Sequence, residues 1–157
     1  MTELEKLFDQ VKEHSRRSMV EEGGIYPTFF CHIPDNDACG VIPCIWNSPF
    51  QKRYVIEQVK AKFRELKIER YAFYGESWMT DRRGLAADEP TPAERMAVRQ
   101  EVIFVYAENR NGCAKAGWWP ISDVAGQVTL GDFVARDAEA YSAGNMFANM
   151  FGVDIFN

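Results

Sequence analysis

The sequence has little of what most catalytic and nucleic-acid-binding proteins need. It contains only two histidines, His14 and His32, and no glycine-rich phosphate-binding loop follows a candidate strand. No apolar run approaches the roughly 20 residues that span a bilayer. Acidic residues (23) outnumber Lys and Arg (18), so the net charge is −5, whereas a general nucleic-acid binder presents a basic surface. We therefore expect neither general nucleic-acid binding nor a membrane-spanning segment.

The first residues of the chain, 1–6, are charged and lack the apolar centre of a signal peptide. A cytoplasmic location is the expectation, and the four cysteines are then reduced thiols. No stretch reads as an interdomain linker. We therefore expect one domain over residues 1–157, because hydrophobic residues (46%) and aromatic residues (13%) are abundant enough for a single core.

Two long helices and one shorter helix are predicted. Thr2 and Glu5 form a capping box ahead of an amphipathic repeat, and Gly23-Gly24 ends this first helix. Ser48 caps a second helix in the same way. Its apolar stripe consists of Tyr54, Val55, Val59, Phe63 and Leu66. The shorter helix is expected over residues 138–151, at the C-terminal end.

Apolar and aromatic runs bounded by turn residues predict the strands. The expected strands are residues 26–33, 41–46, 70–79, 101–108, 113–120 and 128–133. Short hairpins join neighbours in this order. The pattern therefore predicts an α+β domain with a largely antiparallel five- to six-stranded sheet, two long helices on one face and a shorter C-terminal helix.

The two hairpins also predict which residues face each other. A symmetric loop in the first hairpin places Cys31 opposite Cys44. Asn111-Gly112 is a strong signal for a two-residue turn in the second hairpin. The resulting pairs are Glu108 with Lys115, Val105 with Trp118 and Phe104 with Trp119.

Cys31, His32, Cys39 and Cys44 are residue types that bind zinc, and they lie close in the sequence. Cys31 and His32 are strand neighbours whose side chains point to opposite faces, so they do not easily share an ion. We expect buried thiols that pack as small apolar side chains, with no metal site and no cofactor. Because neither histidine has a nucleophile within reach on this pattern, no catalytic residue is assigned.

Glu76 is the least explained charged residue, because it lies among aromatic side chains in the strand at 70–79. A carboxylate in such surroundings needs a partner. An arginine from the polar connection 81–100 supplies one, and Arg83, Arg95 and Arg99 are the candidates. The alternative is an acid–base or divalent-metal site in which Glu76 converges with Asp81 and Glu108.

Three short stretches resemble a loose pattern found in small uncharacterised bacterial and phage proteins. They are the run 74–79, the arginine-bearing connection that leads into the apolar strand 102–108, and the tail 145–151. The resemblance covers about the second half of the chain. It implies a small accessory protein, bacterial or phage-encoded, and assigns no functional residue.

The apolar sheet suggests an interaction protein. On the predicted register Phe104, Tyr106 and Trp119 share one face, and an uncovered remainder would form an aromatic patch suited to a protein partner or to self-association as a homodimer. The candidate contact or ligand residues are Glu76, Trp78, Arg95, Arg99, Tyr106 and Trp119. The alternative is a small-molecule-binding protein or hydrolase-type enzyme with a carboxylate site around Glu76, under the 81–100 connection.

Overall fold

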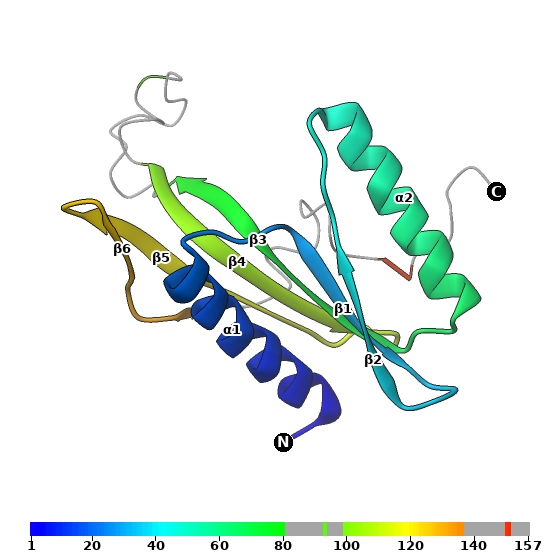
Figure 1. Ribbon diagram of the computed structural model, residues 1–157. Helices are drawn as coiled ribbons and strands as arrows, with labels where there is room; N and C mark the ends of the chain where they lie inside the picture. The colour runs from blue at the N-terminus through cyan, green and yellow to red at the C-terminus, as the bar shows by residue number, and fades with distance from the viewer. Residues whose placement is uncertain (81–92, 94–98, 137–149, 152–157) are drawn as a thin grey trace.

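The computed structural model describes residues 1–80, 93, 99–136 and 150–151, which form two helices and a seven-stranded antiparallel sheet (Figure 1). The helices are α1 (Glu3–Glu22) and α2 (Pro49–Glu65). The strands are β1 (Thr28–Ile33), β2 (Ala38–Pro43), β3 (Arg70–Thr80), β4 (Arg99–Asn109), β5 (Ala114–Val124), β6 (Gln127–Leu130) and β7 (Val134–Arg136). Their order is β2-β1-β3-β4-β5-β6, and β7 also pairs with β5. The predicted α+β class is confirmed.

Both predicted helix starts are confirmed, with their caps. The Thr2 hydroxyl accepts a hydrogen bond from the Glu5 N–H (3.1 Å), and the Glu5 carboxylate accepts one from the Thr2 N–H (2.9 Å). The helix ends at Gly23, whose φ of 76° lies in the left-handed region that glycine adopts without strain. At α2, the Ser48 hydroxyl accepts from the Gln51 N–H at 3.1 Å. Local sequence therefore sets where both helices begin.

The two long helices lie on opposite faces of the sheet, so the prediction that both cover one face is wrong. One core cluster contains Ile56, Val59 and Phe63 of α2 with Phe29, Tyr71 and Phe73 of the sheet. The other contains Leu7, Phe8 and Val11 of α1 with Phe30, Ala72 and Tyr74. Alternate residues of a strand point to opposite faces, so β3 is apolar on both sides because each side has its own helix.

The β1–β2 hairpin has a different register from the predicted one. Cys31 is opposite Gly40 and not Cys44, and β2 ends at Pro43. The turn is confined to residues 34–37, where Asp37 adopts φ 53°, so residues 38–40 join the strand. Gly40 suits this position, because a Cβ there would lie 2.9 Å from the Cys31 sulfur.

The β4–β5 hairpin is offset by one residue from the prediction. Asn109 and Cys113 bracket a three-residue loop in which Gly112 has φ 83°, and the Gly112 N–H donates to the Asn109 carbonyl at 3.2 Å. This is the longer hairpin loop with a glycine in the left-handed region, and not a two-residue turn. A shift of one residue exchanges faces, so Trp119 is opposite Ile103 and Trp118 is opposite Phe104.

The C-terminal helix expected at 138–151 lies outside the described residues, apart from its last two. Met150 is fully buried in the α2-side cluster, and Phe151 packs against it. The Phe151 ring centroid lies 5.3 Å from that of Tyr71 and 6.4 Å from that of Phe63. Among the described residues, no helix is long and apolar enough to cross a membrane.

The contact between β5 and β7 generates a prediction about Gly117. A Cβ at Gly117 would lie 2.4 Å from Phe133 Cζ and 2.7 Å from the Val134 carbonyl oxygen, and the latter belongs to the backbone. We expect Gly117→Ala to lower the free energy of unfolding in urea by about 1–3 kcal/mol. Gly131→Ala is the matched control, because its Cβ would meet Pro120 only at 3.5 Å. Equal stability of the two variants would contradict the packing described here.

Candidate functional site

Three of the residues singled out from the sequence lie together at one end of the β3–β4 pair. Trp78 is opposite Glu101, and Arg99 is opposite Thr80, one pair further along the same face. The Arg99 guanidinium lies 4.4 Å from the centroid of a Trp78 ring that is 55% exposed. This is a cation–π contact at the surface, of the kind worth about 0.5–1 kcal/mol.

Glu76 is exposed on the same face as Trp78, and the predicted ion pair with Arg99 is not formed. Its carboxylate lies beside the Gly24–Ile25 backbone, where partial loss of water raises the pKa of Glu76. The charge of Glu101 raises this pKa further, and a hydrogen bond from the Ile25 backbone opposes the rise. No ion pair to Glu76 is found within the residues that the structure describes.

Arg95, Arg83, Asp81 and most of the 81–100 connection lie outside the described residues. The proposed small-molecule or hydrolase-type site around Glu76 depends on that connection. It therefore stays a prediction.

Tyr106 is fully buried, which corrects its proposed role as a contact residue. Its hydroxyl donates to the Glu108 carboxylate at 2.7 Å, and Tyr71 is opposite Glu108 on the same face. The pKa of Tyr71 is raised mainly by burial and then by the charge of Glu108. The pKa of Tyr106 is raised mainly by burial, and then by the hydrogen bond to Glu108 and the charge of that carboxylate. Glu108 thus belongs to a buried polar group inside the core.

The predicted partner of Glu108 makes other contacts. Lys115 lies opposite Ala107, and its ammonium group is 3.9 Å from a Glu5 carboxylate oxygen and 5.6 Å from the Phe8 ring centroid. The one-residue register shift turns Lys115 to the α1 face, away from Glu108. Lys115 therefore helps to hold α1 on the sheet.

Trp119 also belongs to the packing of α1. Its indole N–H donates to the Lys12 carbonyl at 3.3 Å, and its ring meets that of Phe133 edge-on at 5.0 Å. Trp119 and Tyr106 consequently lie on opposite faces, each packed with a different helix. They do not form the shared aromatic patch that the predicted register implied.

The cysteines divide into two classes. Cys31 and Cys44 are buried in the α2-side cluster, where burial raises the pKa of each thiol to about 11. Cys39 and Cys113 are exposed. His32 pairs instead with Asp37, with 2.5 Å between Nε2 and Oδ1. Within the described ranges, no group of three His, Cys, Asp or Glu residues is placed to hold a metal ion.

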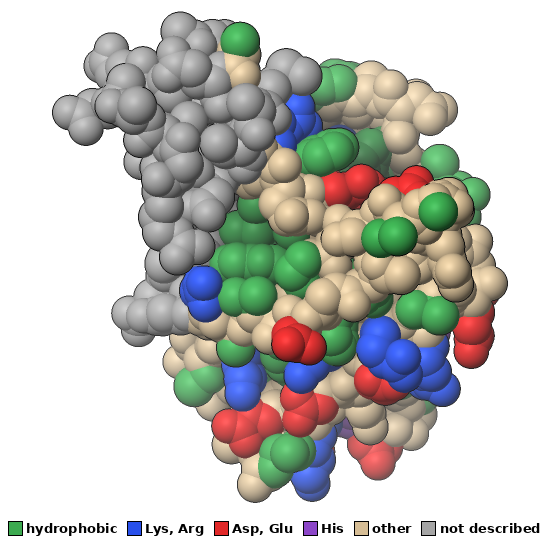
Figure 2. All heavy atoms as spheres, turned by 90° about the vertical axis from the view of Figure 1, so that its left-hand side faces the viewer, with side chains coloured by type: hydrophobic (Ala, Val, Ile, Leu, Met, Phe, Trp, Pro, Cys, Tyr) green, Lys and Arg blue, Asp and Glu red, His purple; other side chains and the backbone are tan. Residues whose placement is uncertain are grey.

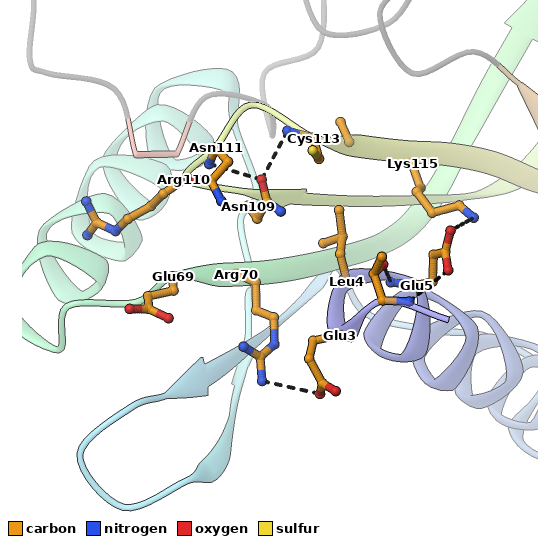
Figure 3. A pocket seen from close by; sticks show the side chains of 12 residues that line it. Glu3, Leu4, Glu5, Glu69, Arg70, Asn109, Arg110, Asn111, Cys113 and Lys115 are labelled. Carbon is orange, nitrogen blue, oxygen red and sulfur yellow. Dashed lines mark hydrogen bonds and ion pairs between the residues drawn. The ribbon is translucent and has the colours of Figure 1, made fainter.

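A hollow of about 650 Å³ is formed where the start of α1 meets the β4–β5 turn (Figure 3). Two ion pairs cross it: Glu3 with Arg70 at 3.8 Å and Glu5 with Lys115 at 3.9 Å. These pairs tie α1 to β3 and β5. Because opposite charges meet within the hollow, it does not favour a ligand of one charge sign.

Figure 2 views the molecule from the left-hand side of Figure 1. Acidic and basic side chains are interspersed over the lower part of this face, while hydrophobic side chains gather near its centre. A surface with both charge signs mixed attracts no partner of one sign over long range.

The β2 edge contributes none of the candidate contact residues predicted from the sequence. The Cys44 N–H donates to the Pro27 carbonyl at 2.7 Å, which continues the β1–β2 ladder. Hydrogen-bonded pairs recur at every second residue of an antiparallel ladder. The backbone groups of Cys39, Val41 and Pro43 therefore face away from β1, and no described residue pairs with them.

An apolar groove of about 480 Å³ runs between this edge and α2. It is lined by residues of β1 and β2 and the segment after β2, among them Ile33, Gly40, Ile42 and Ile45, and by Val55 and Val59 of α2 with its C-cap Leu66. Val41 and Ile45 beside it are 57% and 69% exposed. The sequence signal for this surface was Pro43, whose missing N–H suits an outward-facing edge position.

The chain matches no protein-family model, no curated protein and no solved structure. The resemblance to small bacterial and phage proteins therefore stays a prediction.

The buried tyrosines generate the next prediction. Tyr106→Phe removes one hydrogen-bond donor to the Glu108 carboxylate, inside the core. We expect the free energy of unfolding, measured by urea denaturation, to fall by about 1–3 kcal/mol. The matched control is Tyr54→Phe, because Tyr54 is 61% exposed on α2 and should change stability by no more than about 0.5 kcal/mol. If both variants are as stable as the parent protein, the Tyr106–Glu108 bond does not contribute to folding.

Proposed function

We propose that this chain is a non-enzymatic protein-interaction module that binds an extended polypeptide segment along β2. The observation that carries the proposal is the β2 edge, with which no described residue pairs, and the apolar groove beside it. Edge strands with outward N–H and carbonyl groups are templates for pairing with another strand. Binding of this kind uses main-chain hydrogen bonds for affinity and side-chain pockets for selectivity.

The position of the groove indicates which side chains a bound segment presents. Ile42 and Gly40 of β2 lie on the α2 face of the sheet, together with the opposite residues Phe29 and Cys31. In a segment added beside β2, every second side chain would point to this face. These side chains would enter the groove between β2 and α2, so apolar residues at alternate positions fit best.

The backbone donors on β2 limit the length of the ladder. Cys39 and Val41 present outward N–H groups, whereas Pro43 presents only its carbonyl. Proline at an edge is one of the ways by which proteins limit uncontrolled strand addition. We expect the bound segment to pair over the Cys39–Pro43 part of β2.

The α2 helix gives this side of the molecule a local charge. It carries five basic residues (Lys52, Arg53, Lys60, Lys62 and Arg64) and two acidic residues (Glu57 and Glu65). Lys62 itself lines the groove. In a chain with a net charge of −5, this local excess favours a segment that bears acidic residues beside its apolar ones.

A selection of random peptides of about eight residues, a common strand length, tests the proposal. We expect the selected peptides to carry apolar residues at alternate positions. Their Kd, measured by fluorescence polarisation, should rise about tenfold or more for Val41→Pro, because the outward N–H of Val41 is lost. Val41→Lys should act similarly by placing a charge on the edge.

The matched control is Val20→Lys on α1, since Val20 is 56% exposed and Val41 is 57% exposed. Circular dichroism and urea denaturation should show that all three variants are folded. The proposal fails if no peptide binds, or if Val41→Pro binds the selected peptides as tightly as the parent protein.

A further inference from the structure

We infer that the segment received by β2 is β2 of a second copy of this chain, giving a twofold-symmetric dimer with one continuous sheet. This inference rests on the proposed function. A closed dimer of this type uses the same surface on both copies, so each residue i that contacts j is matched by j contacting i. The β2 edge meets this condition, because antiparallel pairing of two identical strands is symmetric.

The outward backbone groups of Cys39, Val41 and Pro43 favour a twofold axis at Val41, the middle residue of the three. With Val41 opposite Val41 of the second copy, Gly40 is opposite Ile42 of the second copy, and Cys39 is opposite Pro43 of the second copy. The Ile42 side chain of each copy then lies on the α2 face beside Gly40 of the other copy, at the groove. Each outward N–H of Cys39 and Val41 meets a carbonyl of the second copy, at Pro43 and Val41.

Charge complementarity between the β1–β2 turn and the start of α2 supports a second copy as the occupant. The turn between β1 and β2 carries Asp35 and Asp37, both exposed, at one end of β2. The α2 helix starts beyond the opposite end of β2, as Figure 1 shows. Antiparallel pairing exchanges these ends, so the acidic turn of each copy approaches the start of α2 of the other.

The start of α2 is a suitable neighbour for that acidic turn. Its first turn contains no acidic residue, and Arg53, which follows that turn, is exposed. The helix N-terminus adds a partial positive charge that favours carboxylates. Pairing centred on Val41 aligns Asp35 and Asp37 of one copy with residues 47 and 45 of the other, immediately before the N-cap Ser48. The bond from His32 lowers the pKa of Asp37, which keeps that carboxylate charged.

The same pairing also covers exposed apolar side chains. Val41 meets its own counterpart, and Ile45 lies beside the incoming turn. Gln58 and Lys62 line the groove, and Tyr54 and Phe50 continue their i, i+4 row towards the start of α2, where they are 61% and 80% exposed. One symmetric interface would therefore bring both α2 helices together on one side of a continuous sheet.

Sedimentation velocity and light scattering test the inference on the full chain. We expect a mass of twice 18.0 kDa, a monomer for Val41→Pro, and an unchanged dimer for the control Val20→Lys. If the protein stays monomeric up to about 1 mM, the inference that β2 pairs with a second copy is wrong. The peptide selection would then decide separately whether β2 binds other strands. A dimer that persists in Val41→Pro would equally overturn the inference.

Disulfide trapping tests the position of the twofold axis. In a background with the exposed thiols removed (Cys39→Ser, Cys113→Ser), Val41→Cys should form a covalent dimer on mild oxidation. Paired Cα atoms about 5.5 Å apart in a ladder are within the range that a disulfide spans. Val20→Cys in the same background is the control and should stay monomeric under denaturing electrophoresis. Equal trapping at both positions would overturn the axis at Val41.

A charge exchange tests the acidic turn against the start of α2. Asp35→Lys alone and Arg53→Glu alone should each raise the dimer Kd by about threefold or more. The double variant should restore it, because Lys at 35 then meets Glu at 53 of the other copy. The effect should shrink as salt is added. Single variants that dimerise like the parent protein, or a double variant weaker than either, would show that this charge contact is absent.

Discussion

The burial of β3 on both faces is the constraint on which the rest of the structure depends. Tyr71 and Phe73 point towards α2, while Ala72 and Tyr74 point towards α1, and all four are buried. A strand with two apolar faces is stable only if both faces are covered, since burying a side chain the size of Phe contributes about 1.5–3 kcal/mol. The two helices therefore divide between the faces, and these four residues of the central strand are not available to a partner.

This arrangement moves the surface for interaction from the sheet face to the sheet edge. The aromatic residues that suggested a docking face, Tyr106 and Trp119, hold α2 and α1 in place instead. The strand farthest from the centre on the β1 side is β2, whose outward backbone groups have no partner within the described residues. An edge of this kind needs either protection or a strand to pair with, and Pro43 protects only one of its positions.

The sequence allowed much of the local structure to be predicted because local structure depends on local chemistry. Capping boxes, helical spacing and the strand runs lie within a few residues of each other, and the structure has α1, α2 and the central strands where these patterns indicate. The errors lie in register. Asn111-Gly112 signals a turn, but the signal does not distinguish a two-residue turn from the three-residue loop that forms. That one residue decides which helix Trp118, Trp119 and Lys115 face.

In the candidate site, too, one part could be predicted from the sequence and another could not. Glu76, Trp78 and Arg99 are three of the six candidate contact residues predicted from the sequence, and the β3–β4 pairing brings these three to one end of the sheet. Their mutual contacts could not be predicted, because Arg99 can reach either an acid or an aromatic ring, and it lies on Trp78. By itself, the sequence determined the two capped helices, the hairpins and the two-faced apolar strand, since these follow from neighbours along the chain. Only the tertiary structure decided which face each helix covers, which aromatic residues are buried and which strand forms the edge of the described sheet beside β1, because these depend on strand register and on packing between residues far apart in the sequence.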